Sequence, residues 1–315
     1  MPDIILHHYD LSPFCEKIRL ALGLKGLTWR SVKVEAVPPR PLLDALTGGY
    51  RRLPVLQIGA DIYCDSEMVY RALERIAPEP TLYPRGEGIA KALSLWWDRA
   101  TWKPAIGVLV HHIGEHLPEA FLVDRKMNYL GYDISKPAMA PMLPAYVQQL
   151  TAFAQWLDSM LAEHGDYLTG PAVSAADLTC HHTLWLLRAN CGADTIDAQL
   201  GLSNRVTAWL DRVAAIGHGT CVEIAPEAAI EAARAAEPAE PGIGCNDPSG
   251  LAQGSRVTVT PDDNARVPVE GLLVAADAQE VVIAREDPMV GRVHVHFPRA
   301  GFEVLPAAEA VRSVA

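Results

Sequence analysis

The first 80 residues alternate short strand-like runs with helical stretches, and this order limits the possible folds more than any other feature of the chain. Apolar or alternating runs, typical of strands, lie at residues 4–9, 27–34, 54–58 and 61–64. Helical stretches lie at residues 13–25, 41–46 and 66–76. Gly59-Ala60 joins the last two strands as a hairpin-like turn, and Pro78 and Pro80 stop the last helix. The sequence therefore predicts a small α/β domain over residues 1–80.

The order strand-helix-strand-helix-strand-strand-helix is the plan of a thioredoxin-like domain. Residues 81–237 instead carry helical periodicity and few strand signals, so we expect an all-helical domain there. Its expected helices lie at residues 88–116, 144–164, 175–190, 203–216 and 226–236. The stretch 118–143 is rich in Pro, Met and Tyr and is expected to be an irregular excursion between two long helices.

The composition changes again at residues 238–249, where Pro and Gly indicate a linker. Beyond it, strand candidates lie at residues 256–260, 267–275, 280–285, 292–297 and 302–305. Their regular spacing predicts a small five-stranded antiparallel β-barrel, SH3-like in size, within residues 250–315. This region carries six Arg against nine Asp and Glu, which does not suit an oligonucleotide-binding surface. We expect it to serve packing or assembly.

The whole chain of 315 residues is acidic, with 27 Lys and Arg against 38 Asp and Glu. This balance argues against nucleic acid and against an anionic membrane surface as partners. No apolar run reaches the roughly 18 residues that cross a bilayer, and the N-terminal residues lack the features of a signal peptide. The six cysteines are dilute and form no C-x-x-C pair, which indicates a reducing compartment and excludes a local cysteine zinc site. We therefore expect a cytoplasmic protein.

The segment DLSPFCEKIR at residues 10–19 carries the strongest chemical signal. Pro13 fits the first turn of a helix, so Ser12 stands at a strand-to-helix junction where free N–H groups favour an anion. A thiolate bound there would gain a hydroxyl hydrogen bond and a favourable helix dipole. Alternatively, Ser12 only caps the helix. Cys15 is open to two interpretations, a one-thiol catalyst or a buried and inert residue, and the second is favoured.

Two further motifs indicate a site for a peptide-like ligand. A proline that opens a central strand, as Pro54 does, makes sense if the preceding bond is cis and the backbone of Leu53 stays free to pair with a ligand. Asp65 and Ser66 stand just before a helix. Ser66 is placed to cap that helix and to bind a carboxylate, and Asp65 to accept an ammonium group. An α-amino acid head would suit this pair.

Together these motifs resemble those of the glutathione transferase family. Ser-Pro-Phe at residues 12–14 is similar to the tau-class motif in which the serine activates glutathione, whereas omega and lambda relatives have a cysteine at that place. Arg-Leu-Pro-Val-Leu at residues 52–56 resembles the cis-proline loop, and Asp-Ser at residues 65–66 resembles the acidic-Ser pair for the γ-glutamyl group. Residues 170–177 resemble the capping box of the central buried helix. The resemblance covers residues 1–235 and does not extend to the tail.

The resemblance implies transfer of glutathione to a small apolar electrophile, without a metal, by a protein that usually forms a homodimer. Ser12 would stabilise the thiolate, acting as a hydrogen-bond donor. The residues implied to bind substrate are Phe14, Arg52, Leu53, Pro54, Asp65 and Ser66, and Asp65, Ser66 and the Leu53 backbone would bind the tripeptide. The loop at residues 47–52 departs from the family's Asn-Pro-x-Gly-Lys pattern, which leaves Arg52 as the candidate for the glycyl end. Two alternatives stay open: a glutathione-dependent thiol oxidoreductase that uses Cys15, and a non-catalytic glutathione-binding or scaffold protein.

Other conspicuous residues have mainly structural interpretations. Ser-Ala-Ala-Asp at residues 174–177 is a capping-box pattern that begins a helix expected to be buried. Glu16 and Lys17 are expected to be surface charges. His112 and His116 have the spacing of two metal ligands, but no third ligand is apparent. At least one of His181 and His182 is expected to be a hydrogen-bonded core group, and structural roles are expected for His294 and His296. Candidates for the electrophile pocket are Trp96, Trp97, Trp102, Tyr129 and Tyr132, and one of the two adjacent tryptophans is expected in the core.

Overall fold

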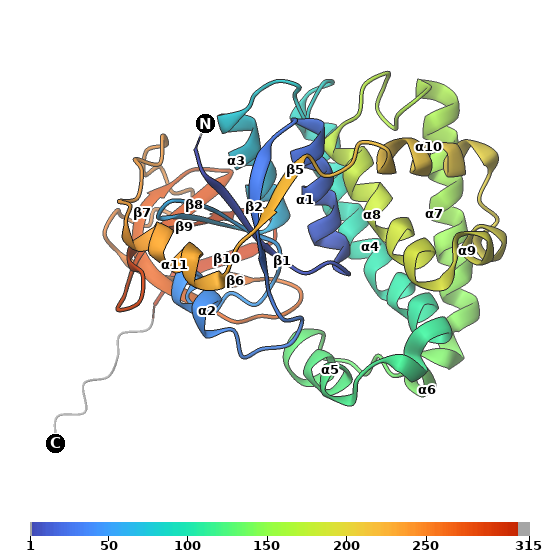
Figure 1. Ribbon diagram of the computed structural model, residues 1–315, viewed down its shortest axis with the longest axis horizontal. Coiled ribbons are helices and arrows are strands. Elements are labelled where there is room, and N and C mark those ends of the chain that lie inside the picture. Colours follow the sequence, from blue (N-terminus) through green and yellow to red (C-terminus); the bar gives the residue numbers. More distant parts are fainter. Residues whose placement is uncertain (1, 308–315) are drawn as a thin grey trace.

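The computed structural model describes residues 2–307, so residue 1 and the last part of the expected tail, residues 308–315, lie outside it. Within the described range one mixed sheet runs through the molecule in the order β10-β6-β7-β8-β9-β4-β3-β1-β2-β5 (Figure 1). Its strands are β1 (Ile4–His8), β2 (Thr28–Lys33), β3 (Val55–Ile58), β4 (Asp61–Cys64), β5 (Thr220–Glu223), β6 (Arg256–Pro261), β7 (Val269–Ala276), β8 (Glu280–Asp287), β9 (Gly291–Pro298) and β10 (Phe302–Pro306).

Strands β1 to β4 and three helices confirm the predicted thioredoxin-like plan. The helices are α1 (Pro13–Leu24), α2 (Pro41–Thr47) and α3 (Ser66–Ile76). β1 is central, because it pairs parallel with β2 and antiparallel with β3. All five residues of β1 are buried, as expected for a strand covered on both faces. α1 and α3 lie on the face of the sheet that meets the helical domain (Figure 1).

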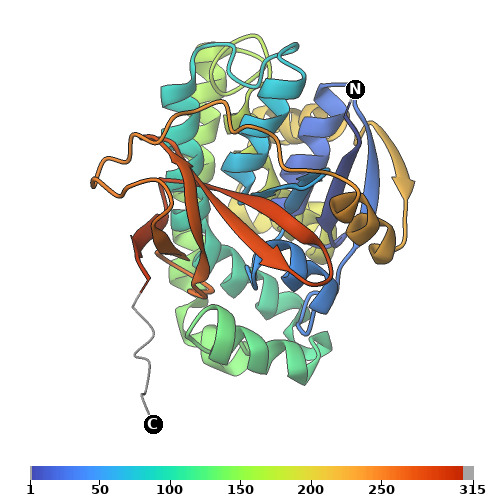
Figure 2. The ribbon, with the colours of Figure 1, turned by 90° about the vertical axis from the view of Figure 1, so that its left-hand side faces the viewer.

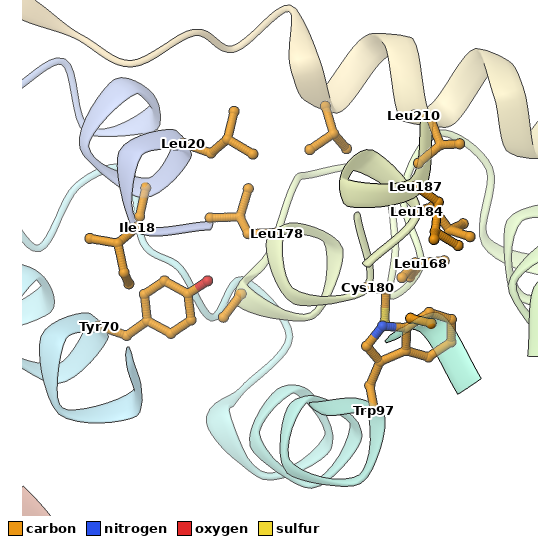
Figure 3. Close-up of a cluster of buried hydrophobic side chains, with 14 of the residues drawn as sticks. Ile18, Leu20, Tyr70, Trp97, Leu168, Leu178, Cys180, Leu184, Leu187 and Leu210 are labelled. Carbon is orange, nitrogen blue, oxygen red and sulfur yellow. The ribbon is translucent and has the colours of Figure 1, made fainter. Parts of the chain in front are cut away.

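The helical domain is built around a buried central helix, as predicted. Its helices are α4 (Glu87–Ile113), α5 (Glu119–Asp124), α6 (Lys136–Met139), α7 (Leu143–His164), α8 (Ala175–Cys191), α9 (Ala193–Leu200) and α10 (Asn204–Ala214). Leu178, Leu184 and Leu187 of α8 pack between neighbouring helices, with Ile18 of α1 on one side and Trp97 of α4 on another (Figure 3). Among the described helices none is both long and apolar enough to cross a membrane.

The capping box that begins α8 is present. The backbone N–H of Ser174 donates to Asp177 at 2.9 Å, and the Ser174 side chain caps the helix in return. Asp177 is fully buried and also accepts hydrogen bonds from the Leu168 N–H at 2.7 Å and from Trp209 Nε1 at 3.0 Å. Its carboxylate therefore fastens the start of α8 to the preceding loop and to α10.

The segment after α10 differs from the expected all-helical course of residues 81–237. β5 adds to the sheet beside β2, and α11 (Pro226–Arg234) packs against α2 and the sheet. β5 is only four residues long and all four are exposed, so its sequence carries no alternating apolar pattern that would predict a strand. The expected helix at residues 226–236 is confirmed as α11, but it lies with the sheet and not in the helical bundle.

The five C-terminal strands are present and are antiparallel to one another, in the order β10-β6-β7-β8-β9. They lie beside the thioredoxin-like strands (Figure 2). They continue that sheet, because β9 pairs parallel with β4 in a register that aligns Asp61 with His294. The predicted strands are therefore confirmed, whereas the expected separate barrel is an extension of the first sheet. The pairing partner of β9 lies more than 200 residues earlier in the chain, which no local pattern reveals.

A buried polar network joins this extension to β4. His296 of β9 lies between two carboxylates, with Nε2 3.1 Å from Asp61 Oδ1 and Nδ1 2.9 Å from Glu280 Oε1. Arg75 of α3 pairs with Glu280, and Arg71 lies 3.1 Å from it. Burial by itself would lower the pKa of His296, but the two carboxylates outweigh burial and raise it. The imidazolium is thus held as the positive centre of the junction. The expected structural role of His296 agrees with these contacts.

Candidate functional site

A cavity of about 340 Å³ opens where the thioredoxin-like part, α4 and the C-terminal strands meet. A smaller cavity of about 30 Å³ adjoins it on the side of Ser12. Phe14, Leu53, Trp102 and Tyr129 line both cavities and so connect them. The residues of the large cavity that sequence reasoning singled out as ligand-binding are Phe14, Arg52, Leu53, Pro54, Asp65 and Ser66.

Asp65 and Ser66 lie at the start of α3 and face the large cavity. Asp65 is the N-cap, because its Oδ1 accepts a hydrogen bond from the Glu67 N–H at 3.0 Å. The expectation that Ser66 caps this helix is therefore wrong. Asp65 takes the cap because its φ of 80° turns the chain sharply before the helix, a conformation that Asp tolerates better than most residues. Consequently the Ser66 hydroxyl has no partner among residues 2–307 and remains available to a ligand at a helix N-terminus.

Leu53 and Pro54 form a second side of the large cavity. The bond between them is cis, as predicted. Within the described residues, no protein group hydrogen-bonds to the backbone N–H or C=O of Leu53. A free backbone donor and acceptor beside β3 are what an extended peptide needs in order to pair with a strand.

Ser12 lines the smaller cavity and is the N-cap of α1. Its Oγ accepts a hydrogen bond from the Cys15 N–H at 3.2 Å. Since a hydroxyl can accept and donate at the same time, this cap leaves the Ser12 proton free for a second partner. The capping interpretation and the anion-binding interpretation are thus compatible.

Cys15 lies inside the core and lines neither cavity. Its side chain is completely buried and packs in a cluster with Leu46, Val55 and Cys64. Burial raises the pKa of the Cys15 thiol, which disfavours the reactive thiolate. Cys64 is likewise completely buried, and burial also raises its pKa. The favoured interpretation of Cys15 as a buried, inert residue agrees with these observations.

Three arginines near Ser12 were not singled out from the sequence. Arg40, Arg51 and Arg125 all line the smaller cavity. Asp124 is the carboxylate that pairs with two of them, at 2.6 Å from both Arg51 and Arg125. The Nε of Arg51 is buried without a partner within the described range. The cluster therefore favours an anionic group. In the sequence, only the basic loop at residues 51–52 indicates it. Arg125 comes from the stretch expected to be irregular, where it directly follows α5.

Glu16 and Lys17 are buried, so the expectation that they are surface charges is wrong. Lys17 lines the large cavity, with Nζ 2.7 Å from Asp98 Oδ2, and Asp98 Oδ1 lies 2.7 Å from His182 Nε2. Glu16 pairs with Arg19 at 2.6 Å. Each charge is compensated by a partner, as buried charges require. Asp98 lies 81 positions beyond Lys17, too far for a pattern in the first helix to reveal.

Arg52 is held by the C-terminal region, which from the sequence is expected to be a separate barrel away from the site. Its guanidinium donates to the Asp263 carboxylate and to the Asn264 carbonyl in the loop after β6. Both loop residues line the large cavity, as does Phe302 at the start of β10. The C-terminal region therefore also forms part of the cavity wall, in addition to the packing or assembly role expected of it. Arg52 also faces the cavity, but its charge is already compensated by Asp263.

The aromatic and histidine candidates divide between the core and the cavity wall. Trp102 and Tyr129 line the cavity, whereas Tyr132 does not. Trp97 is the predicted core member, since Nε1 donates to Thr183 at 3.1 Å, and Trp96 lies partly exposed beside it. His112 hydrogen-bonds to Gln199 at 2.8 Å, and His181 and His182 are both buried. Among residues 2–307 no cluster of three or more His, Cys, Asp or Glu side chains could hold a metal ion.

Comparisons with known proteins agree with this arrangement. Residues 6–81 match the profile described as "Glutathione S-transferase, N-terminal domain". The chain is 26% identical over 97 residues to "Glutathione S-transferase U4" of Arabidopsis thaliana, and the match covers 31% of this chain and 43% of that protein. The chain thus spans less than half the length of that curated relative. A glutathione S-transferase from Rhodospirillum rubrum F11 shares the fold, with 21% identity, a TM-score of 0.51, and coverage of 67% of this chain and 87% of that one.

The C-terminal strands have a counterpart in a solved structure. The crystal structure of a GST-like protein from Pseudomonas syringae matches with a TM-score of 0.79 and 38% identity. The match covers 98% of this chain and 100% of that one, so it includes the region beyond residue 237. On this whole-length similarity, together with the profile match in the first domain, the chain belongs to the glutathione transferase family.

Proposed function

We propose that this protein is a glutathione transferase that joins glutathione to a small apolar electrophile, with Ser12 stabilising the thiolate. The observation that carries the proposal is the convergence of three groups on one cavity: the free backbone of Leu53, the carboxylate of Asp65 and the hydroxyl of Ser66. Membership of the family supports a glutathione-related transferase function in general.

Each of these groups suits a different part of glutathione. The carboxylate of Asp65 accepts the γ-glutamyl ammonium group, and Ser66, at the N-terminus of α3, donates to the adjoining α-carboxylate. The N–H and C=O of Leu53 pair with the cysteinyl backbone in the manner of an added strand. This alignment directs the thiol from Leu53 toward the smaller cavity, which Leu53 and Ser12 share.

Ser12 would stabilise the thiolate by donating its hydroxyl proton, which the cap leaves free. The positive end of α1 adds to this stabilisation and lowers the pKa of the bound thiol. The thiolate then uses an electron pair to form a carbon–sulfur bond with the electrophile, while the hydroxyl of Ser12 stays intact. Either the carbon–leaving group bond breaks and the leaving group departs with its electron pair, or a carbon–carbon π bond breaks and the resulting carbanion takes a proton from water. Phe14, Trp102 and Tyr129 line the junction of the two cavities and offer an apolar electrophile an aromatic surface.

The arginine cluster suits the glycyl carboxylate better than Arg52 does. Arg40, Arg51 and Arg125 line the smaller cavity, and among the described residues Asp124 pairs with Arg51 and Arg125 but not with Arg40. Arg52, in contrast, is already paired with Asp263. We therefore assign the glycyl end to the cluster and keep Arg52 as a residue that faces the ligand from the side of the C-terminal loop.

Of the two rival functions, the burial of Cys15 weighs against the thiol oxidoreductase, because a mixed disulfide requires an accessible thiolate. The non-catalytic binding protein shares the same tripeptide site and differs only in turnover. The homodimer that the family resemblance implies and the cytoplasmic location that the cysteine pattern indicates remain predictions. Light scattering on the purified protein tests the first of them.

Calorimetry with glutathione tests the tripeptide site. We expect Asp65→Ala and Ser66→Ala each to weaken binding by about 1–3 kcal/mol, because each removes a charge-assisted hydrogen bond. Cys221→Ser is the matched control, because Cys221 is exposed on β5 and lines neither cavity. Equal affinity in wild type and both site variants would show that glutathione binds elsewhere.

Turnover with model electrophiles tests the role of Ser12. Ser12→Ala is expected to lower turnover roughly ten- to a thousandfold, the scale of losing one donor to a developing or bound anion, with little change in glutathione affinity. Unchanged turnover would remove Ser12 from the mechanism. Glutathione binding without turnover by the wild type, across several electrophile classes, would favour the non-catalytic alternative. A mixed disulfide on Cys15 after treatment with oxidised glutathione would favour the oxidoreductase.

A further inference from the structure

The C-terminal β region supplies one wall of the glutathione cavity proposed above. Asp263, Asn264, Gln279 and Phe302 all line it, although they lie more than 200 positions beyond the cis-proline loop. The loop after β6 is held in place from two directions. Arg52 donates to Asp263 and Asn264, and the Ala265 N–H donates to the Tyr129 carbonyl at 2.7 Å. The wall is therefore bonded both to the thioredoxin-like part and to the helical domain.

Tyr50 connects this wall to the ligand-binding loop. Its ring lies against two C-terminal phenylalanines, edge-on to Phe297 with ring centroids 5.7 Å apart and stacked on Phe302 at 6.3 Å. The side chain is 1% exposed and lines the cavity together with Asp65. Two phenylalanines from β9 and β10 thus fix the orientation of a residue in the first domain.

The hydroxyl of Tyr50 is buried and has no hydrogen-bond partner among residues 2–307. Buried hydroxyls in native proteins nearly always have a partner, so one left free beside a cavity indicates a ligand group. Burial and the nearby Asp65 carboxylate raise the pKa of Tyr50 well above its ordinary value. The phenol therefore keeps its proton and can act as a hydrogen-bond donor.

We propose that the Tyr50 hydroxyl donates a hydrogen bond to the α-carboxylate of the γ-glutamyl head of glutathione, and that Phe297 and Phe302 are its positioning residues. This assignment rests on the proposed glutathione site. Asp65 pairs with the ammonium group of the same head. The α-carboxylate is the anionic group of the ligand that lies closest to this ammonium group. A neutral donor suits that place, because the carboxylates of the cavity already have cationic partners: Lys17 pairs with Asp98, and Arg52 pairs with Asp263. A further cation would compete for these carboxylates. The C-terminal region then sets specificity for the head of the ligand.

Calorimetry with two glutathione analogues tests the assignment. Tyr50→Phe keeps the ring and its packing, and we expect it to weaken glutathione binding about tenfold to a hundredfold, as for a lost bond to a charged group. With 4-aminobutyryl-Cys-Gly, which lacks the α-carboxylate, the variant and the wild type should bind equally. With glutaryl-Cys-Gly, which keeps that carboxylate and lacks the amino group, the loss should persist. Tyr83→Phe is the matched control, because Tyr83 also has an unpartnered hydroxyl within the described range but does not line the cavity.

The outcomes separate this assignment from the proposed function. If the wild type binds no glutathione, the proposed function fails and the assignment fails with it. If the wild type binds glutathione and Tyr50→Phe binds it equally well, only the assignment is overturned. A loss of the same size with all three ligands would also overturn it, because that result indicates a general disturbance of the site.

A second set of variants tests the positioning role of Phe302. Phe302→Leu removes the ring that stacks on Tyr50, and we expect it to reduce the preference for glutathione over 4-aminobutyryl-Cys-Gly several-fold. Phe302→Tyr keeps the ring and should retain the preference. Leu305→Ala, on an exposed position of the same strand, is the control. An unchanged preference in Phe302→Leu would show that Tyr50 does not depend on the C-terminal region.

Discussion

The thioredoxin-like sheet is extended at both edges, and the two extensions differ in how they are held. At the β2 edge, β5 adds parallel to its neighbour, and all four of its residues are exposed. At the β4 edge, β9 also adds in parallel, but six of its eight residues are buried. His296 of β9 is bonded to two carboxylates, whereas no ion pair between β5 and β2 is found within the described range.

The two extensions also differ in what they contribute to the cavities. β5 and the segments beside it contribute no residue to either cavity. β10, which follows β9, contributes Phe302 to the large cavity, and the loop between β6 and β7 contributes Asp263. A wall of a binding site must hold its position to within a fraction of an ångström, which requires packing and paired polar groups. The junction at His296 provides this packing and pairing. The β5 edge supports no cavity wall and so does not require them.

The largest expected effect comes from breaking the junction. Replacing His296 with Ala leaves the buried carboxylates of Asp61 and Glu280 without the cation between them. We expect this variant to lower the free energy of unfolding by about 3–5 kcal/mol, as measured by urea denaturation. A loss below about 1 kcal/mol would mean that Arg71 and Arg75 alone neutralise the two carboxylates, and that the two edges are held alike.

The pH dependence of the same variant sharpens the comparison. Because the folded pKa of His296 is raised above 6.5, its stabilising contribution is fully present below pH 6.5 and is lost as pH rises through the folded value. Asp61, Glu280 and Tyr63 contact it directly, and Arg71 and Arg75 pair with Glu280. We therefore expect the stability difference between wild type and His296→Gln to be largest below pH 6.5 and to shrink as pH rises above it. A difference that grows over this range would contradict the assignment of a charged imidazole.

The test compares wild type with His296→Gln because other buried histidines change the stability in the opposite direction with pH. Burial lowers the pKa of His7 to about 4, and burial together with Arg19 lowers that of His8 to about 3. Neutral buried imidazoles such as these stabilise the fold above pH 6.5, and that contribution is lost as pH falls. The same two residues are present in wild type and variant, so their effect cancels in the difference.

A smaller effect is expected at the loop that closes the cavity. Asp262 accepts a hydrogen bond from Arg99 at 2.6 Å, and both side chains are partly exposed. Exposed pairs of this kind contribute about 0.2–1 kcal/mol. Asp262→Asn should therefore weaken glutathione binding by no more than about fivefold, as measured by calorimetry. A loss of a hundredfold would show that this pair, and not Arg52, holds the loop.

The smallest effect is expected at the opposite edge. Val222 of β5 is 53% exposed, and β5 lies at the end of the sheet. Val222→Thr keeps the branched shape that suits a strand, so the free energy of unfolding should change by less than about 0.5 kcal/mol and glutathione affinity should not change. A destabilisation comparable to that of His296→Ala would remove the contrast between the two edges.

The local features of the site could be predicted from the sequence, because each follows from neighbouring residues. Ser12 before Pro13, Leu53 before a cis-proline, and Asp65 beside Ser66 all lie where the motifs predict. The long-range features could not be predicted. The alternation of β9 predicts a strand with one apolar face, but not that its neighbour is β4. Likewise the sequence around Lys17 predicts a surface residue, because its partner Asp98 is distant in the sequence.

The parallel pairing of β9 with β4 has a consequence for synthesis on the ribosome. His296 follows Asp61 by 235 positions, so at about 5–20 residues per second the edge of β4 waits roughly 10 to 50 seconds for its partner. An unpaired apolar edge is a template for aggregation, and a charge that points inward from such an edge discourages it. Asp61 sits on that edge, and in the finished sheet its carboxylate is buried beside β9. We therefore expect the same aspartate that anchors the finished sheet to protect the nascent chain, and Asp61→Val to increase aggregation of a chain that ends at residue 237.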